Sequence, residues 1–279
     1  MKNICEAIKE VLINSKEIIL ENNSADLQGG GMPFDVDRCV KSLDWCEVSM
    51  VGRVVSATKM NGVTFIQKYI PYTYVGITAE ENDPYAMVYA VTKALESGTN
   101  VCVYISSDKN CITTAFVLGL IGRVADGFDL TVDLETDKEA FEKELQFDKT
   151  LIIGSRVFYN KFVCVTPKEY IPFGVTDVIC MDEALYENVA SQLDGVNLYT
   201  KFECDKATQV VRGIEEAVAL VNLSGDRYRT VLFSQNESCI RFFTSFIKSD
   251  SVIVNTYNEE KELPNISQYS FIRLVNYLA

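Results

Sequence analysis

Two short apolar runs, Tyr74-Val75-Gly76-Ile77-Thr78 and Val101-Cys102-Val103-Tyr104-Ile105, give the clearest indication of the fold class of this chain. The first is followed by a stretch with helical character, Pro84–Ser97, and the second by another, Cys111–Val124. Proline is favoured in the first turn of a helix, because its missing N–H would be unpaired there in any case. Apolar strands that alternate with helices are typical of a parallel sheet covered by helices. We therefore predict an α/β fold.

The same alternation continues along the chain on both sides of these runs. Short apolar runs predict strands at Phe128–Leu134, Thr150–Ile153, Val175–Met181, Thr230–Phe233, Ser251–Asn255 and Tyr269–Tyr277. Helices are expected at Ile4–Leu20, Val36–Leu43, Asp137–Leu145, Glu183–Leu193, Ile214–Leu223 and Asn236–Ile247.

Val51–Ile70 alternates apolar and polar positions on both sides of Asn61-Gly62. This dipeptide best tolerates the positive φ angles of a type I′ turn, so the segment predicts a β-hairpin. A two-stranded ribbon is marginally stable alone, and we expect it to gain a further strand.

Composition narrows the class of protein. The chain has 279 residues, 48% of them hydrophobic, which suits one large domain or two smaller lobes. A net charge of −13 without a basic run disfavours nucleic acid as a partner. The longest uncharged apolar run, Cys111–Ile121, is about half of a membrane span, so no membrane partner is expected and we predict a cytoplasmic protein.

The nine cysteines predict reduced core residues rather than a disulfide framework. Their number is odd, and most lie inside apolar stretches such as Val163-Cys164-Val165. The chain has no CxxC pair and no histidine. We therefore expect no metal site, and neither a Ser-His-Asp nor a Cys-His nucleophile.

Two turns at strand ends are candidate ligand sites, although the chain has no GxGxxG motif. Ser106 and Ser107 follow the second run and could offer hydroxyls and amides to a phosphate, or could simply begin the next helix. Asn82, just before Pro84, could donate to an oxyanion or belong to a helix start. Cys111, after Lys109 at a helix start, is the cysteine placed best for activation.

Several stretches in one order resemble γ-glutamyl phosphate reductase, a member of the aldehyde dehydrogenase superfamily. They are Ile18-Ile19-Leu20-Glu21-Asn22-Asn23-Ser24-Ala25-Asp26-Leu27, the hairpin around Met60-Asn61-Gly62, Ile70–Ile77, Ala94–Val101 and Glu215–Thr256. The resemblance covers about the whole chain, with a large deletion in the middle.

The resemblance implies an aldehyde dehydrogenase-like fold, with two Rossmann-like three-layer lobes and a β-hairpin oligomerisation arm. We expect a cofactor-domain-like lobe at residues 1–159, including the arm at 51–70. A truncated catalytic-domain-like lobe is expected at 160–256, and a tail at 257–279 whose strand joins the sheet of the arm. A homodimer would then bury Phe65, Ile66, Tyr69, Phe271, Ile272 and Leu274 between subunits.

Departures from the family pattern bear on activity. Asn82 matches the family's oxyanion-hole asparagine and is the expected substrate-binding residue, with Ser106 and Ser107 as expected cofactor-binding residues. Tyr104 stands where the family has a basic cofactor contact, and Pro172 aligns with the nucleophilic cysteine. A pyrrolidine ring cannot attack an acyl phosphate or an aldehyde, so no catalytic residue is expected.

These departures predict a catalytically inactive protein that binds a partner or a small metabolite and carries no cofactor. The partner could be a related enzyme subunit or a second copy in a homodimer. One alternative is an NADP-dependent aldehyde or acyl-phosphate oxidoreductase that uses a displaced nucleophile. Another is a purely structural interaction protein.

Overall fold

A computed structural model describes residues 3–46, 50–60, 63–193, 196–224, 228–257 and 263–278. The chain divides into two compact units. Unit 1 comprises residues 1–153, 161–170 and 266–279, and unit 2 comprises residues 154–160 and 171–265. The chain therefore passes between the units more than once around residue 159, where a single boundary was expected.

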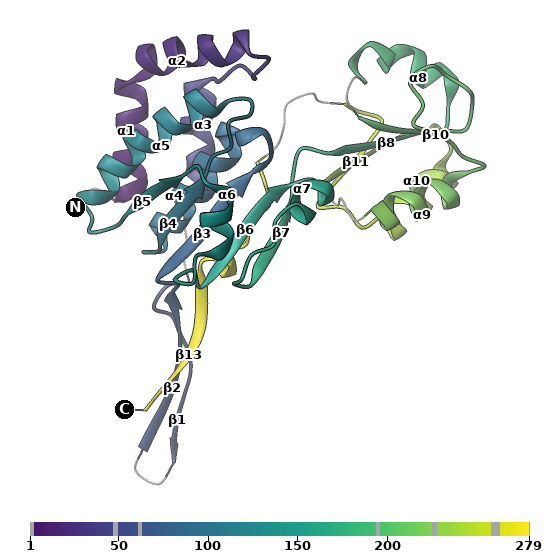
Figure 1. The fold of residues 1–279 in the computed structure, drawn as a ribbon. Helices are drawn as coiled ribbons and strands as arrows, with labels where there is room; N and C mark the ends of the chain where they lie inside the picture. The colour runs from purple at the N-terminus through teal and green to yellow at the C-terminus, as the bar shows by residue number, and fades with distance from the viewer. Residues whose placement is uncertain are drawn as a thin grey trace. The chain divides into compact units, whose positions relative to one another are not determined.

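Unit 1 contains a five-stranded sheet in the order β5-β4-β3-β6-β7 (Figure 1). Its central strand, β3, pairs in parallel with β4 on one side and β6 on the other, and β4 pairs in parallel with β5. The predicted parallel sheet is confirmed for these strands. Their bounds are β3 Tyr74–Ala79, β4 Asn100–Tyr104, β5 Val132–Glu135, β6 Lys149–Gly154 and β7 Lys168–Pro172.

Helices pack on this sheet and on one another. Helix α4 (Pro84–Glu96) follows β3 after a 3-10 turn, η2 (Glu80–Asn82), and nearly all of its residues are buried. Helix α5 (Cys111–Asp126) follows β4 and contacts α4, and the short α6 (Lys138–Lys143) follows β5. The predicted helices at these places are confirmed.

The amino-terminal segment forms two helices, where one helix over Ile4–Leu20 was expected. Helix α1 (Ile4–Asn14) ends at Ser15, whose φ of −101° and ψ of 9° interrupt the helical path. Helix α2 (Lys16–Gln28) then runs in a different direction (Figure 1), and both helices contact α5. The apolar positions continue across Ser15, so the sequence pattern does not show the break. Helix α3 (Val36–Ser42) and the 3-10 turn η1 (Leu43–Trp45) follow.

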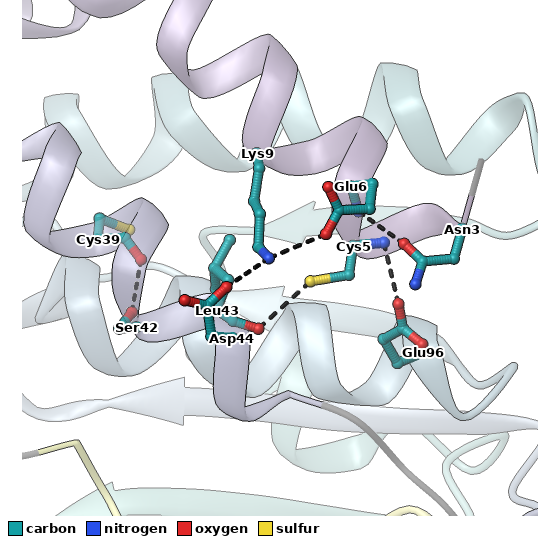
Figure 2. A network of polar contacts seen from close by, with 9 residues as sticks. All are labelled: Asn3, Cys5, Glu6, Lys9, Cys39, Ser42, Leu43, Asp44 and Glu96. Atoms are coloured by element: carbon teal, nitrogen blue, oxygen red, sulfur yellow. Dashed lines mark hydrogen bonds and ion pairs between the residues drawn. The ribbon is translucent and has the colours of Figure 1, made fainter.

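A polar network fixes α1 to the rest of unit 1 (Figure 2). The Cys5 N–H donates to the Glu96 carboxylate over 3.0 Å, and its thiol donates to the Leu43 carbonyl over 3.4 Å. Lys9 pairs with Asp44 at 2.6 Å. Burial raises the pKa of the Cys5 thiol to about 11, so the thiol stays protonated and remains a donor at neutral pH.

The predicted hairpin is confirmed as β1 (Val54–Met60) and β2 (Val63–Pro71), which pair antiparallel. Its expected type I′ turn at Asn61-Gly62 lies outside the described residues. Strand β13 (Ile272–Leu278), which follows the 3-10 turn η4 (Gln268–Ser270), pairs antiparallel with β2 in the same chain. We call this three-stranded sheet β1-β2-β13 the arm (Figure 1).

Phe271, just before β13, and Ile272, its first residue, are buried in a different way from the one that the sequence predicted. Phe271 and Ile272 are 0% and 2% exposed within the single chain, where burial between subunits was expected. The Phe271 carbonyl accepts hydrogen bonds from the Tyr72 N–H at 2.9 Å and the Thr99 hydroxyl at 3.2 Å. These two side chains therefore anchor β13 in the core of unit 1.

Unit 2 contains a second five-stranded sheet, in the order β10-β9-β8-β11-β12, with every described pair parallel (Figure 1). Two clusters of buried side chains form its core, and α9 and α10 contribute to one of them. The bounds are β8 Thr176–Cys180, β9 Asn197–Thr200, β10 Gln209–Val210, β11 Arg229–Phe233, β12 Ser251–Val254, α7 Arg156–Asn160, α8 Glu183–Val189, η3 Ala190–Gln192, α9 Ile214–Ser224 and α10 Glu237–Phe246.

Among the α-helices and strands that the structure describes, α7, β7, β9 and β10 were not predicted. Each has five residues or fewer and mixes polar with apolar positions, so none shows the continuous apolar run that marks the strands predicted at equal length. Across the described part of the chain, we find no helix with the length and apolar character that a membrane crossing requires.

Candidate functional site

The candidate site is a cavity of about 470 Å³ at the carboxyl ends of β4 and β5, next to the start of α5. Open α/β sheets place their ligands beyond the carboxyl ends of their strands. The cavity has the volume of a small-molecule site. It is lined by Tyr104, Ile105, Ser106, Ser107, Asp108, Cys111, Ala115, Leu134 and Thr136.

Tyr104 forms an apolar wall of the cavity. Its side chain is 9% exposed, and its ring packs against Phe141 at 5.6 Å and Phe162 at 5.9 Å between centroids. Burial raises the pKa of Tyr104, and Lys138 opposes this shift while Asp108 adds to it. The hydroxyl therefore stays neutral over the physiological range and can act as a hydrogen-bond donor.

Ser106 and Ser107, the expected cofactor-binding residues, both line the cavity. The Ser106 hydroxyl lies 2.8 Å from the Asp108 carboxylate and 3.4 Å from Asn82 Oδ1, so it is engaged within its own loop. Ser107 and Thr136 are exposed, and each presents a hydroxyl at the rim of the cavity. The structure thus brings the two predicted serines together with residues from the end of β5.

Asn82 lies behind this loop and is 1% exposed. Its Nδ2 donates to the carbonyls of Ser106 and Lys109, each at 3.0 Å, and its Oδ1 accepts from the Ser106 N–H at 3.0 Å. Both amide protons are therefore engaged with backbone. The observed contacts make Asn82 a clamp on the turn that lines the cavity, and they give no support to the expected role in binding substrate.

Asn110 supplies a second clamp on the same turn. It adopts a positive φ of 61°, and its Nδ2 donates to the Glu81 carbonyl at 3.0 Å while its Oδ1 accepts from the Met32 N–H at 2.7 Å. Glu81 and Asn82 also have positive φ, 54° and 52°. Left-handed backbone costs a non-glycine residue about 1 kcal/mol, so the two interlocked turns keep a strained but fixed conformation.

The amino-terminal end of α5 is capped by a carboxylate from α2. Asp26 is 6% exposed, and it accepts hydrogen bonds from the Ile112 N–H at 3.3 Å, the Thr113 N–H at 2.7 Å and the Thr113 hydroxyl at 2.6 Å. Unpaired N–H groups at a helix start attract anions. Here an internal carboxylate already takes that position.

All nine cysteines are free, as the sequence predicted. Burial raises the pKa of six thiols, to about 11 for Cys5 and Cys180 and to about 12 for Cys39 and Cys102, with Cys46 and Cys164 shifted in the same direction. Such thiols are poor nucleophiles, because the thiolate is the reactive form. Cys111 lies in a different environment from these six thiols, because it is half-buried and lines the cavity.

Pro172, the residue expected at the nucleophile position, is the last residue of β7. Cys180, at the end of β8 in unit 2, is fully buried and its thiol donates to the Asp182 carbonyl at 3.4 Å. Among the residues that the structure describes, no group of three or more Cys, Asp and Glu side chains is arranged to hold a metal ion.

Sequence reasoning missed the part of the cavity that comes from β5 and from the second turn of α5. Leu134, Thr136 and Ala115 are ordinary strand and helix residues in the sequence. Their proximity follows from the parallel pairing of β4 with β5, in which Val103 lies opposite Leu134. The order of strands in the sheet would have been the signal, because neighbouring carboxyl ends share one edge.

No protein-family model matches the chain, and no curated protein matches it in sequence. Solved structures do match it over nearly its whole length. Gamma-glutamyl phosphate reductase from Saccharomyces cerevisiae is 13% identical, with a TM-score of 0.55, over 99% of this chain and 90% of that one. PnpE from Pseudomonas sp. WBC-3 is 12% identical, with a TM-score of 0.72, over 99% and 85%.

Betaine aldehyde dehydrogenase from Staphylococcus aureus, solved in complex with NAD⁺, is 12% identical over 99% of this chain and 81% of that one, with a TM-score of 0.70. Likeness at this level of identity shows the fold alone. The chain has the aldehyde dehydrogenase fold, as the sequence resemblance implied.

Proposed function

We propose that this protein is a catalytically inactive member of the aldehyde dehydrogenase fold that binds a small organic molecule in the cavity at the ends of β4 and β5. One combined observation supports the proposal: the chain has a cavity of small-molecule size, and most of its thiols are buried. The cavity is held by two asparagine clamps, which is the rigid support that a binding site needs.

The inactivity rests on the chemistry of the thiols. Covalent attack on an aldehyde or an acyl phosphate needs a thiolate within reach of the carbonyl. Cys180 is fully buried and its pKa is raised by burial, and Pro172 stands at the position that the resemblance assigns to the nucleophile. Neither residue supplies a thiolate at neutral pH.

A turnover assay tests the inactivity. Purified protein should show no NAD(P)H-dependent reduction of γ-glutamyl phosphate and no NAD(P)⁺-dependent oxidation of glutamate semialdehyde above the rate without protein. The alternative, an oxidoreductase with a displaced nucleophile, has Cys111 as its best-placed thiol because this thiol lines the cavity. Turnover that Cys111→Ser abolishes would establish that alternative and overturn the proposal.

Ligand binding is tested through the same thiol. The rate of maleimide labelling at Cys111, followed by mass spectrometry, should fall when a ligand fills the cavity. Ala115→Trp should fill the cavity from its own wall and abolish that protection, whereas Leu223→Trp, on the exposed face of α9, should leave it intact. Binding that survives Ala115→Trp would place the ligand elsewhere.

The proposal includes a homodimer formed through the arm and a location in the cytoplasm. Exposed apolar side chains on the arm, among them Phe65 and Leu274 at 45% and 47% exposure, support the first. Nine free cysteines support the second, since reducing compartments keep thiols free.

A further inference from the structure

We propose that the cavity at the ends of β4 and β5 takes an organic cation with an apolar body, such as an aromatic amine, rather than a ligand that carries phosphate. This inference rests on the proposed function, because it names the class of molecule that the same cavity binds. Three observations support it, from the lining, from the charged side chains behind it, and from the helix start beside it.

The lining of the cavity carries one formal charge, and that charge is negative. Among the nine described residues that line it, Asp108 is the charged side chain, and none is a lysine or an arginine. One carboxylate oxygen of Asp108, Oδ2, accepts from the Ser106 hydroxyl at 2.8 Å. The side chain is exposed at the rim, where its carboxylate can also pair with an ammonium group.

Cations close to the cavity are already paired. Lys138 lowers the pKa of Tyr104 through its charge, and its Nζ is 2.8 Å from Glu142 Oε1 and 2.7 Å from the Lys161 carbonyl. Lys109 pairs with Glu81 at 3.1 Å.

The charged groups that act on Tyr104 are therefore predominantly negative. Among them are one cation, Lys138, and three carboxylates, those of Asp108, Asp137 and Glu142. A negative surrounding opposes the entry of phosphate and favours a cation, and the water-poor wall of the cavity strengthens both effects.

The start of α5 is closed to an anion from outside. Helix starts commonly bind phosphate because their first N–H groups are unpaired. Here the N–H groups of Ile112 and Thr113 donate to the Asp26 carboxylate, at 3.3 Å and 2.7 Å, and the carboxylate is nearly inaccessible. A phosphate at this position would meet a buried negative charge in place of free donors.

The remaining surfaces fit an apolar body with a hydroxyl. Tyr104, Ile105, Ala115 and Leu134 supply the apolar walls, and a volume of about 470 Å³ suits a ring with a short side chain. The exposed hydroxyls of Ser107 and Thr136 lie at the rim and can accept or donate.

Three molecules of nearly equal shape test the charge preference, namely tyramine, 4-hydroxyphenylacetamide and 4-hydroxyphenylacetate. Affinity is measured by calorimetry on the full chain, with Cys111 protection as the second readout. Tyramine should bind at least about 10-fold more tightly than 4-hydroxyphenylacetate, and the amide should lie between them. Raising the salt concentration should reduce the gap.

Two matched variants locate the source of the preference. D108N should reduce the ratio between tyramine and 4-hydroxyphenylacetate to less than about 3-fold while the amide binds as before. D126N, which removes the same charge near the other end of α5, should leave the ratio unchanged. A preference that survives D108N unaltered would overturn the assignment to Asp108.

The outcomes separate this inference from the proposed function. If 4-hydroxyphenylacetate, inorganic phosphate or NADPH binds more tightly than tyramine and protects Cys111, the cavity is a binding site but the charge assignment is wrong. If none of these five molecules protects Cys111 or gives heat of binding, both the cation preference and the small-molecule site as defined here are refuted.

Discussion

The Asn82 side chain holds the turn that contains Ser106 and Lys109. Both of its amide protons and its amide oxygen are engaged in hydrogen bonds with that turn. Replacing Asn82 with alanine would leave the Ser106 and Lys109 carbonyls and the Ser106 N–H without their partner in a part-buried turn. Each lost partner costs about 1–3 kcal/mol, and partial relaxation of the turn offsets some of it. We expect Asn82→Ala to lower the free energy of unfolding by about 3 kcal/mol, measured by urea denaturation.

Two comparison variants separate the hydrogen bonds from the backbone strain. Asn82→Gly loses the same hydrogen bonds but suits the positive φ of 52°, so it should be about 1 kcal/mol more stable than Asn82→Ala. Asn188→Ala removes an exposed bond to the Ala184 carbonyl and should change stability by less than about 0.5 kcal/mol. Equal stability of Asn82→Ala and Asn188→Ala would show that the clamp contributes nothing.

The buried thiols make the stability of the fold sensitive to alkali. Burial raises the pKa of Cys39 from 9.0 to about 12, so the folded state keeps its proton where the unfolded chain loses it. The stabilisation that the buried, protonated Cys39 thiol gives to the folded state is fully present below pH 9. It is lost as the pH rises through the pKa of the folded state. Between pH 8 and pH 10, one such thiol should lose about 1.4 kcal/mol of stabilisation.

Cys39→Ala checks this directly. The difference in unfolding free energy between the wild-type chain and this variant should shrink by about 1.4 kcal/mol from pH 8 to pH 10. Val36→Ala, on the same helix and equally buried, carries no titrating group and should show a constant difference. A constant difference for Cys39→Ala as well would mean that its thiol titrates alike in both states.

What the sequence could predict differs from one residue to the next. Ser106 and Ser107 were singled out by a rule that needs only local sequence, that ligands bind in loops after strands; both line the cavity, and their binding role stays a prediction. The hydrogen bonds of Asn82 were not predicted, since its partners Ser106 and Lys109 lie in another turn, 24 and 27 residues further along the chain. Asp26 was missed for the same reason: a carboxylate on α2 gives no local sign that it caps α5.

The arm shows the same limit for whole strands: the sequence reveals pairings between neighbours in the chain but not pairings between distant segments. The hairpin β1-β2 followed from alternation alone, because its strands are neighbours in sequence. The antiparallel pairing of β13 with β2 joins residues about two hundred positions apart, and the sequence offered it only through a family resemblance. The strands β9 and β10 escaped because they lack the continuous apolar run that marks equally short strands such as β12.

Removing β13 should have two separable effects. A chain that ends after Ser267 loses Phe271 and Ile272, each nearly fully buried and each contributing about 1.5–3 kcal/mol. We expect this truncation to aggregate or to unfold at a markedly lower urea concentration.

A chain that ends after Arg273 provides the control. It keeps Phe271 and Ile272 in the core but loses most of the strand that pairs with β2. We expect it to keep most of its stability while the hairpin gains an unpaired edge. If both truncations are equally unstable, β13 contributes mainly through its pairing in the arm, and the anchoring role assigned to Phe271 and Ile272 is wrong.

At the largest scale, the arm presents two edges that pair with no other described strand, and several exposed apolar side chains. Strands β1 and β13 each pair on one side within the chain, and Val54, Phe65 and Leu274 are 52%, 45% and 47% exposed. An unpaired edge with apolar side chains invites another strand or sheet. A groove of about 600 Å³ on the arm, lined in part by Phe65, Gln67 and Tyr277, offers a surface for such contact.

We therefore predict a homodimer formed through the arm. Light scattering at micromolar concentration should give about twice the chain mass of 31.3 kDa. Phe65→Ser with Leu274→Ser should reduce the mass to that of one chain without unfolding it, because both side chains are exposed in the single chain. As a control, Ile13→Ser with Leu145→Ser changes two exposed residues outside the arm and should leave the dimer intact. A wild-type mass of one chain would show that the arm serves its own subunit alone, and the dimer prediction would then fail.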